Sequence, residues 1–444
     1  MLLYNLRLAW KSVLRHPALS GLIVAGIALG VAVSTSFVTI WHVLAADPIP
    51  GKSDRLHYVR VNSWGGEEPW DEEGHPPTLM TWQDMRRLLG ASDIPVRQTA
   101  SFGGLAYVRP RSEGQQKGQR PFQEKVRMTT ADFFPMFEAP FRYGSGWDRA
   151  ADAKPEAVAV IGSDLNERLF GGRDSVGSTL RINDRDFKIA GVLASWRPKV
   201  RHYDMNGNPY EEPEQVFLPI TLFPALSVEP AGTRSSWRVE TGEFVANLDS
   251  SEMTWIPMWV ELDSAADEKA YASFLDAYAR EQKKLGRFPQ DINNRLSTVV
   301  ELMEEWEVVP QQAKALAAIS ALFLVIAALN LIGLFLGKFL ARSSVVGVRR
   351  ALGASRGAIF AQHLVECEMV ALIGGLLGLG LSLGVLALVN RIYQPAGIDE
   401  AFFKLDPPMM LAALGFALLA GAIAGVYPSW RICAIAPARH LKNQ

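Results

Sequence analysis

The sequence predicts an α-helical membrane protein with four transmembrane helices and a large mixed α/β extracytoplasmic domain inserted between helices 1 and 2. Three observations predict this fold. Four stretches contain no Asp, Glu, Lys or Arg and reach the roughly 20 residues that a helix needs to cross hydrocarbon. A long polar segment separates the first stretch from the other three, and basic residues gather in the short flanks. The four stretches are residues 18–46, 315–337, 369–390 and 407–430.

The flanking charges predict the orientation, because basic residues collect on the cytoplasmic side during insertion. Basic residues precede the first stretch, fill the link between the second and third, and follow the fourth, whereas the link at residues 391–406 has mixed charge. These basic residues are Arg7, Lys11, Arg15, Lys338, Arg342, Arg349, Arg350, Arg356, Arg431, Arg439 and Lys442. Both termini are therefore expected in the cytoplasm, and residues 47–310 are expected outside it, as in a bacterial inner-membrane protein.

Charge balance and cysteine positions limit what the outer domain can bind and how it is stabilised. The chain has 45 basic and 46 acidic residues, so it lacks the basic excess that a nucleic-acid footprint needs. Its two cysteines, Cys367 and Cys433, fall in or beside the cytoplasmic ends of spans. The outer domain contains no cysteine, and it is long enough to be stabilised by its own core.

The pattern of apolar and basic residues in residues 1–46 predicts a helix on the membrane surface, followed by the first span. Leu6, Trp10, Val13 and Leu14 share one helical face, with the basic residues elsewhere, and His16-Pro17 supplies a break. A cleaved signal peptide is the alternative. The apolar run is about twice the length of a normal signal-peptide core, which favours a retained span.

Residues 47–310 predict a mixed α/β domain. Residues 179–182 and 186–193 are expected to form a hairpin around the turn Asn183-Asp184-Arg185. Other expected elements are strands at 56–62 and 157–161 and polar loops at 111–120 and 197–214.

Two helices are predicted in the last part of this domain. Residues 265–285 place Ala270, Phe274, Ala277 and Tyr278 on one face. Residues 296–309 predict a stalk helix that leads directly into the second span, where it would move as a rigid rod, although Pro310 can kink it. The apolar face of this stalk is Leu296, Val299, Val300, Met303 and Trp306.

Three features suggest binding chemistry, and each has a simpler explanation. Residues 46–53, A-D-P-I-P-G-K-S, resemble a phosphate-binding loop but lack its first glycine and its strand-to-helix context. An acidic cluster lacks the alternating ligands of a calcium loop: Glu67, Glu68, Asp71, Glu72 and Glu73. His363 and Glu366 are helical neighbours without further metal ligands. With no recognisable nucleophile either, we expect no catalytic residue, metal or cofactor in this chain.

Glycines four residues apart recur in every span and predict close packing of helix backbones, within one chain or between copies. The pairs are Gly26 and Gly30, Gly333 and Gly337, Gly374 and Gly378, Gly380 and Gly384, and Gly421 and Gly425.

An ordered set of motifs over nearly the whole chain resembles the MacB and FtsX-like ABC transporter permeases. In the outer domain, residues 130–134 (T-A-D-F-F) resemble the family's T-x-D-F-F segment, and residues 159–163 and 187–192 resemble its strand and hairpin signatures. In the membrane half the matching segments are residues 347–355 (G-V-R-R-A-L-G-A-S), Glu366, Gly374-Gly375, residues 427–431 (Y-P-S-W-R) and residues 437–441 (P-A-R-H-L).

The resemblance implies a mechanotransmission subunit that is not itself an enzyme. A separate cytoplasmic ATPase dimer would bind ATP and Mg²⁺, and its closure would move the outer domain through the spans. The implied partners are a second permease copy or a related permease and, for efflux, a periplasmic adaptor and an outer-membrane channel. Extraction of lipoproteins or lipids is a second role within this class. The alternative is an FtsX-like scaffold that activates a periplasmic partner such as a cell-wall hydrolase, without transport; the large outer domain favours the MacB-like branch.

The cytoplasmic link is the predicted site of ATPase coupling. Val345, Val346, Val348 and Leu352 are expected to form an apolar face, with Arg349 and Arg350 to the side, and Gly353 is expected to end the helix. The family commonly has an acidic residue where this chain has Val345. A solvated basic loop is the simpler alternative. The predicted coupling segment is Val346, Gly347, Val348, Arg349, Arg350, Ala351, Leu352, Gly353, Ala354 and Ser355.

Overall fold

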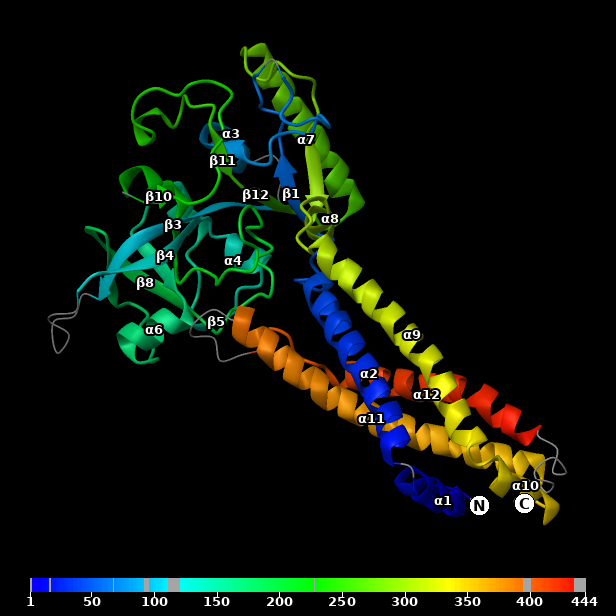
Figure 1. Ribbon diagram of the computed structural model, residues 1–444. Coiled ribbons are helices and arrows are strands. Elements are labelled where there is room, and N and C mark those ends of the chain that lie inside the picture. The colour runs from blue at the N-terminus through cyan, green and yellow to red at the C-terminus, as the bar shows by residue number, and fades with distance from the viewer. Residues whose placement is uncertain are drawn as a thin grey trace. The chain divides into compact units, whose positions relative to one another are not determined.

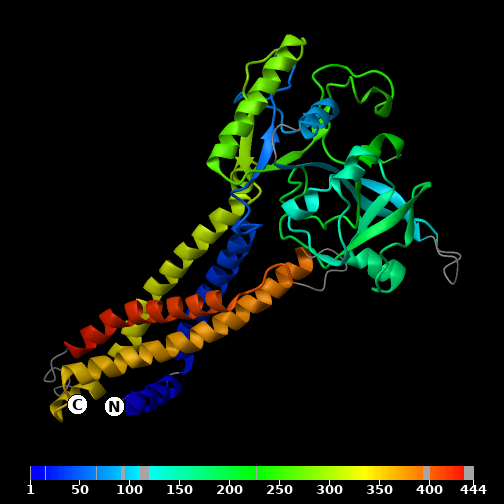
Figure 2. The same cartoon turned by 180° about the vertical axis from the view of Figure 1, so that it is seen from behind.

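The computed structural model describes residues 2–15, 17–66, 68–91, 96–110, 120–226, 228–393 and 401–434. The chain forms two compact units, one made of Met1–Ala46 with Val309–Gln444 and one of Asp47–Val308 (Figures 1 and 2). The predictions at His16, at residues 111–119 of the first polar loop and at residues 437–441 lie outside the described residues.

Four helices of the first unit are long and apolar enough to cross a membrane, as the sequence predicts: α2 (Pro17–Ala45), α9 (Gln311–Leu340), α11 (Arg356–Tyr393) and α12 (Pro407–Cys433). Helix α11 begins well before residue 369, where the charge-free stretch starts. It continues because Ile359, Glu366 and Cys367 in this extension are buried inside the unit.

Two shorter helices complete the first unit, α1 (Leu2–Arg15) and α10 (Ser343–Ala351). Helix α11 is central and packs against α1, α2 and α12, while α9 packs against α2 and α12 (Figure 1). The core between these helices includes Ile23, Ile27, Leu331, Phe335 and Val370.

A sheet of eleven strands forms the second unit, with the order β13-β1-β12-β3-β4-β9-β6-β8-β5 and with β7 and β10 at its sides. Strand β3 bends through both halves of this sheet, since residues 97–100 pair with β12 and residues 101–108 pair with β4. The strands are β1 (Leu56–Arg60), β3 (Arg97–Pro110), β4 (Phe122–Thr129), β5 (Phe141–Gly144), β6 (Val158–Ile161), β7 (Thr179–Ile182), β8 (Arg185–Leu193), β9 (Val216–Pro219), β10 (Glu229–Pro230), β12 (Met258–Glu261) and β13 (Arg295–Thr298). A separate pair consists of β2 (Met80–Thr81) and β11 (Thr254–Ile256).

Short helices and a hairpin surround this sheet. Strands β7 and β8 form the predicted antiparallel hairpin, and Asn183 takes the left-handed conformation (φ 49°) that a tight turn requires. The helices are α3 (Trp82–Leu89), α4 (Phe133–Met136), α5 (Arg149–Ala153), α6 (Ser163–Phe170), α7 (Ala265–Lys284), α8 (Val299–Glu305) and the 3₁₀ turns η1 (Ile220–Ala225) and η2 (Val245–Asn247).

The predicted face of α7 is wrong by one position. Tyr271, Leu275 and Ala279 are buried, whereas Ala270 and Ala277 are exposed. Phe274 and Tyr278 also contact the core but only from its edge. The larger apolar pair, Tyr271 and Leu275, therefore sets the rotation of the helix, and alanine spacing was a poor guide to it.

The predicted continuous stalk helix is also wrong. Residues 295–298 form β13, and α8 ends at Glu305, before a turn in which Glu307 has φ 48°. Helix α9 starts afresh after Pro310, which cannot donate a backbone hydrogen bond inside a helix. Residues 296–298 extend because they pair with β1, so sheet pairing overrode the helical spacing.

Candidate functional site: the coupling link

Helix α10 presents an apolar ridge to its surroundings. Val345, Val348 and Leu352 lie three and four residues apart and are 58%, 52% and 83% exposed. Val346, which the sequence analysis assigned to the same face, points the other way and is buried in the core of the unit. The exposed ridge is therefore one residue smaller than predicted, because Val346 anchors the helix instead.

The two arginines of the link brace α10 against its neighbours. Arg349 donates a hydrogen bond to the Gln362 side chain of α11 at 2.5 Å, and Arg350 donates one to the Cys433 carbonyl of α12 at 3.1 Å. Gly353, at φ 98°, then turns the chain as predicted, and the Ser355 hydroxyl accepts a bond from the Ala358 amide at the start of α11. The link is thus a fixed corner between α9 and α11.

A buried charged cluster lies beneath this corner. The Glu366 carboxylate of α11 is 2.7 Å from the Lys338 ammonium of α9, and both side chains are almost fully buried. Ser12 of α1 donates to Glu366 and accepts from Arg342, which also donates to the Ser12 carbonyl at 3.1 Å. His363 stacks on Phe339 beside it. One carboxylate therefore connects three helices, α1, α9 and α11.

Sequence analysis missed this cluster, which we call the Glu366 cluster and define as Ser12, Lys338, Arg342 and Glu366. The sequence indicates Glu366 only as a family match and as a helical neighbour of His363. A signal was present, since Lys338 directly follows one charge-free stretch and Glu366 precedes another. Charges that close to apolar spans are expensive unless paired. Lys338 and Glu366 lie on different helices, and the spacing of residues within one helix does not predict contacts with another helix.

The predicted packing glycines divide into two groups. A Cβ on Gly374 would lie 2.7 Å from Ile27, one on Gly378 2.8 Å from the Ala28 carbonyl oxygen, and one on Gly425 2.6 Å from the Cys367 sulfur. Gly421 is as tightly placed against Ala371, and Gly26 and Gly30 face α9. By contrast, a Cβ on Gly333, Gly337, Gly380 or Gly384 would meet nothing within 4 Å among the described residues. Among the described residues, only the first group packs helices within this chain.

The chain passes between the two units at two places, and both lead to neighbouring strands. Strand β1 follows α2, and β13 with α8 precedes α9; β1 and β13 pair antiparallel from His57↔Thr298 to Arg60↔Arg295. Arg60, 1% exposed, donates to both carboxylate oxygens of Glu305 on α8 at 2.5 and 2.6 Å. Both connections are therefore held in one hydrogen-bonded element of the second unit.

Residues at these connections are engaged in local contacts. Lys52 of the phosphate-loop-like stretch donates to the Pro135 carbonyl at 2.7 Å and lies 3.0 Å from Glu261, and Ser53 donates to the Ile49 carbonyl. After α8, the Tyr210 hydroxyl donates to the Val308 carbonyl at 2.7 Å. Lys52 and Ser53 of the phosphate-loop-like stretch thus hold the beginning of the second unit together.

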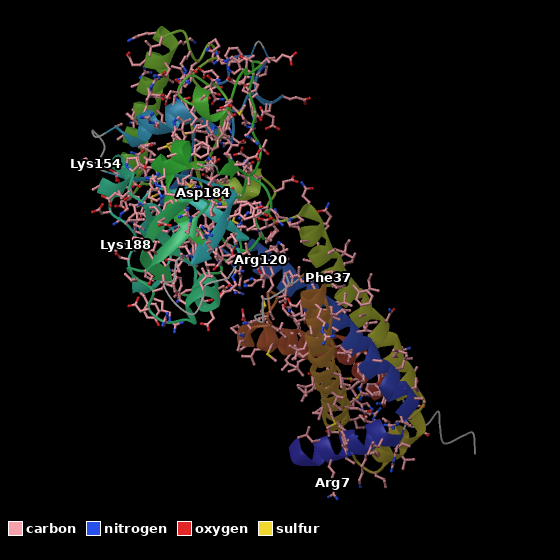
Figure 3. All side chains as sticks on the ribbon, turned by 90° about the vertical axis from the view of Figure 1, so that its left-hand side faces the viewer. Arg7, Phe37, Arg120, Lys154, Asp184 and Lys188 are labelled. Carbon is pink, nitrogen blue, oxygen red and sulfur yellow. The ribbon has the colours of Figure 1, made fainter. Side chains whose placement is uncertain are left out.

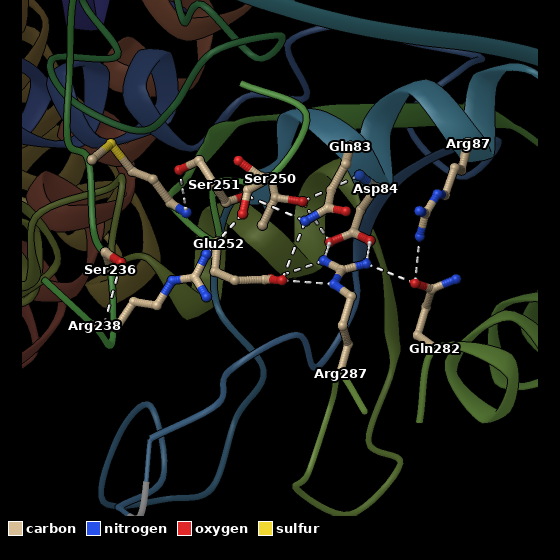
Figure 4. Close-up of polar contacts among 12 residues, drawn as sticks. Gln83, Asp84, Arg87, Ser236, Arg238, Ser250, Ser251, Glu252, Gln282 and Arg287 are labelled. Atoms are coloured by element: carbon tan, nitrogen blue, oxygen red, sulfur yellow. Dashed lines mark hydrogen bonds and ion pairs between the residues drawn. The ribbon is translucent and has the colours of Figure 1, made fainter. Parts of the chain in front are cut away.

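Two buried ion networks stabilise the second unit, and neither was predicted. Arg287 lies 2.7 Å from both Asp84 of α3 and Glu252, joining segments that are distant in sequence (Figure 4). Arg127 of β4 contacts Glu214 at 2.7 Å. Burial alone raises the pKa of the Glu214 carboxyl, but the Arg127 guanidinium outweighs burial and lowers that pKa to about 2.

The T-x-D-F-F segment lies beside a groove of about 550 Å³. Phe133 and Phe134 are buried. Asp132 lines the groove together with Phe134 and pairs with Arg149 at 2.8 Å. Burial raises the pKa of nearby Asp152 to about 6. Among the described residues, no three His, Cys, Asp or Glu side chains are grouped to hold a metal ion.

Four apolar helices, a mixed α/β domain inserted after the first of them, and a braced basic corner between two of the others define a membrane permease subunit. The chain belongs to the MacB/FtsX-like ABC transporter permease family, as the sequence motifs predicted. Residues 20–277 match the MacB-like periplasmic core domain, and residues 317–437 match the FtsX-like permease C-terminal domain.

The relatives that match this chain are distant in sequence. The macrolide export ATP-binding/permease protein MacB of Bdellovibrio bacteriovorus is 22% identical over 81% of this chain and 48% of its own length. The ABC transporter permease YvrN of Bacillus subtilis is 22% identical over the full length of both chains. The crystal structure of the periplasmic region of MacB from Actinobacillus actinomycetemcomitans covers 59% of this chain and 97% of that one, with 10% identity and a TM-score of 0.36. The chain spans about half the length of the ATP-binding/permease relatives.

Proposed function

We propose that this chain couples ATP hydrolysis by a separate cytoplasmic ATPase, which binds ATP and Mg²⁺, to movement of its periplasmic domain. In this proposal α1, α10 and both termini are cytoplasmic in a bacterial inner membrane. The work done is efflux or extraction of a lipoprotein or lipid, in a dimer with a second copy or a related permease. An adaptor and an outer-membrane channel are further partners in the efflux case.

The observation that carries this proposal is the exposed ridge on α10. Val345, Val348 and Leu352 form an apolar surface on a helix too short to span a membrane. Such a surface is costly in water and suits a groove on a partner protein. Because Val346 is buried in the core and Arg349 and Arg350 bond to α11 and α12, force on the ridge passes to these helices.

The paired strands offer a path for that force beyond the membrane. Helices α2 and α9 are each followed or preceded by a segment that is bound into the β1–β13 pair. Breaking that pair costs several backbone hydrogen bonds, so a relative movement of the two helices bends the whole pair before separating it. The rigid part of the pathway is thus a strand pair, in place of the predicted stalk helix.

The test is co-purification with the partner ATPase, comparing wild type with Val348→Asp/Leu352→Asp. We expect recovery of the ATPase to fall at least tenfold while the permease still inserts. Leu285→Asp is the matched control, since Leu285 is 69% exposed at the end of α7 in the other unit. Arg349 and Arg350 are poorer targets, because their contacts also fold the link. Equal ATPase recovery in all three proteins would overturn the docking role of the ridge.

A second measurement separates transport from scaffolding. Labelled substrate or lipoprotein released from vesicles that contain the complex would support transport. Activation of a periplasmic hydrolase without release of substrate or lipoprotein would contradict transport and support the scaffold role.

A further inference from the structure

Helix α1 has two different sides. Ala9 and Ser12 are buried against α11, with Val13 half-buried beside them. The adjoining side carries an apolar ridge of Leu6, Trp10 and Leu14, which are 37%, 51% and 61% exposed. The helix is thus fixed to the protein on one side and leaves a tryptophan and two leucines uncovered next to that side.

A basic ridge runs beside the apolar one. Arg7, Lys11 and Arg15 are four residues apart and exposed, and α1 contains no acidic residue. Figure 3 shows α1 across the end of the helix bundle, with Arg7 pointing away from the other helices. A helix that carries Trp and Leu beside a row of cations, next to a membrane span, is complementary to the headgroup region of an anionic bilayer.

We propose that this outward face of α1 binds anionic phospholipid headgroups, and that the Glu366 cluster transmits its occupancy to the coupling link. The apolar ridge would lie at the acyl boundary and the basic ridge among the phosphodiesters. The proposal extends the proposed function, because it makes the charge of the inner leaflet a regulator of coupling.

The transmitting contacts all start from the buried side of α1. Arg342, the residue before α10, donates to both the hydroxyl and the carbonyl of Ser12, and the same hydroxyl donates to Glu366. Glu366 in turn pairs with Lys338 on the last turn of α9. A shift of α1 on the membrane surface therefore acts on α9, on α11 and on the first residue of the link. Ser12, Lys338 and Glu366 are buried and Arg342 is half-buried, so water weakens their contacts little.

Lipid binding is tested first without any ATPase. The full chain is placed in nanodiscs of phosphatidylcholine alone or with about one third phosphatidylglycerol, and bound lipids are counted by native mass spectrometry. Each cation near an anionic surface contributes about 1 kcal/mol, so Arg7→Gln/Lys11→Gln should weaken phosphatidylglycerol retention roughly tenfold or more. The matched control is Arg356→Gln/Arg431→Gln. It removes two exposed charges, one at the start of α11 and one in the last turn of α12. Equal loss in both variants, or no preference in wild type, overturns the proposal.

Transmission is tested next with the ATPase bound. We expect phosphatidylglycerol to change ATP turnover of the wild-type complex, and Ser12→Ala to abolish that change while lipid retention stays at the wild-type level. Thermal unfolding of Ser12→Ala in detergent identifies a folding defect, and Ser12→Thr, which keeps the hydroxyl, should restore the lipid response. If Arg7→Gln/Lys11→Gln instead prevents ATPase recovery in lipid-free detergent, the face binds the ATPase and the lipid assignment is wrong. Failure of the ATPase to bind wild type in any medium refutes the proposed function but leaves the lipid count standing.

Discussion

Arg60 and Glu305 join the segment after the first membrane helix to the segment before the second. Their two N–O contacts of 2.5 and 2.6 Å form a bidentate pair, the geometry in which an arginine holds a carboxylate most strongly. Ser297 of β13 also accepts from Arg60 at 3.0 Å. A single buried guanidinium therefore holds β1, β13 and α8 together where the chain leaves and re-enters the second unit.

We predict that Glu305→Gln loosens α8. The substitution removes the charge from a bidentate pair and should cost about 1–3 kcal/mol locally. Hydrogen exchange of the full chain should then speed up across residues 299–308. Glu304→Gln is the control, since Glu304 is exposed on the same helix, and it should leave exchange unchanged. Identical exchange in both variants would mean that the β1–β13 pair alone holds α8.

Acid should weaken the second unit through Glu214. The pKa of this carboxyl is about 2 in the folded chain because of Arg127, whereas an unfolded glutamate titrates near 4.3. The unfolded state therefore binds more protons between these values, and stability falls as pH drops through that window. Denaturant unfolding followed by tryptophan fluorescence should show this fall in wild type.

Glu214→Gln should behave differently in the same experiment. It leaves the buried Arg127 without that charge, so it should lower stability at neutral pH by about 3–5 kcal/mol. Its stability should also depend less on pH between 4 and 2. A Glu214→Gln curve parallel to wild type would assign the acid sensitivity to another carboxylate.

Two glycines of α11 should differ in their response to a larger side chain. Gly378→Val places a Cβ 2.8 Å from the Ala28 carbonyl oxygen and from Val31 on α2, and such overpacking costs about 1–3 kcal/mol or more. Gly380→Val, two positions away, meets nothing within 4 Å among the described residues. Thermal melting in detergent should show a lower Tm for Gly378→Val only. A similar loss at Gly380 would reveal a contact made outside this chain.

The Lys338–Glu366 pair should show strong coupling between its partners. Lys338→Met or Glu366→Gln alone leaves a buried charge uncompensated, which costs about 3–5 kcal/mol. The double variant removes both charges and should recover much of that loss. Unfolding in detergent of the four proteins measures the coupling, and strictly additive losses would rule out a direct interaction.

The membrane organisation could be predicted from sequence because it depends on composition over long windows. A stretch without charge and of bilayer length has few alternatives to a spanning helix. The β7–β8 hairpin was also predictable, because Asn183 favours the left-handed turn locally. The family motifs added the class of protein, since their order was specific.

Other features required contacts between distant residues. The rotation of α7 was decided by how Tyr271 and Leu275 fit the core, and residues 296–298 became a strand because β1 offered free backbone partners. The direction of Val346 follows from the bundle beneath α10. Spacing within one segment carries no information about these neighbours.

Sequence by itself thus determined the four spans, the inserted domain and the position of the link, because hydrophobicity and local turn chemistry act within a segment. Tertiary structure alone decided that Ser12, Lys338, Arg342 and Glu366 meet under that link, and that Arg60 closes on Glu305. Buried charges are tolerated only where partners from other segments neutralise them, and the folded chain is what brings those partners together.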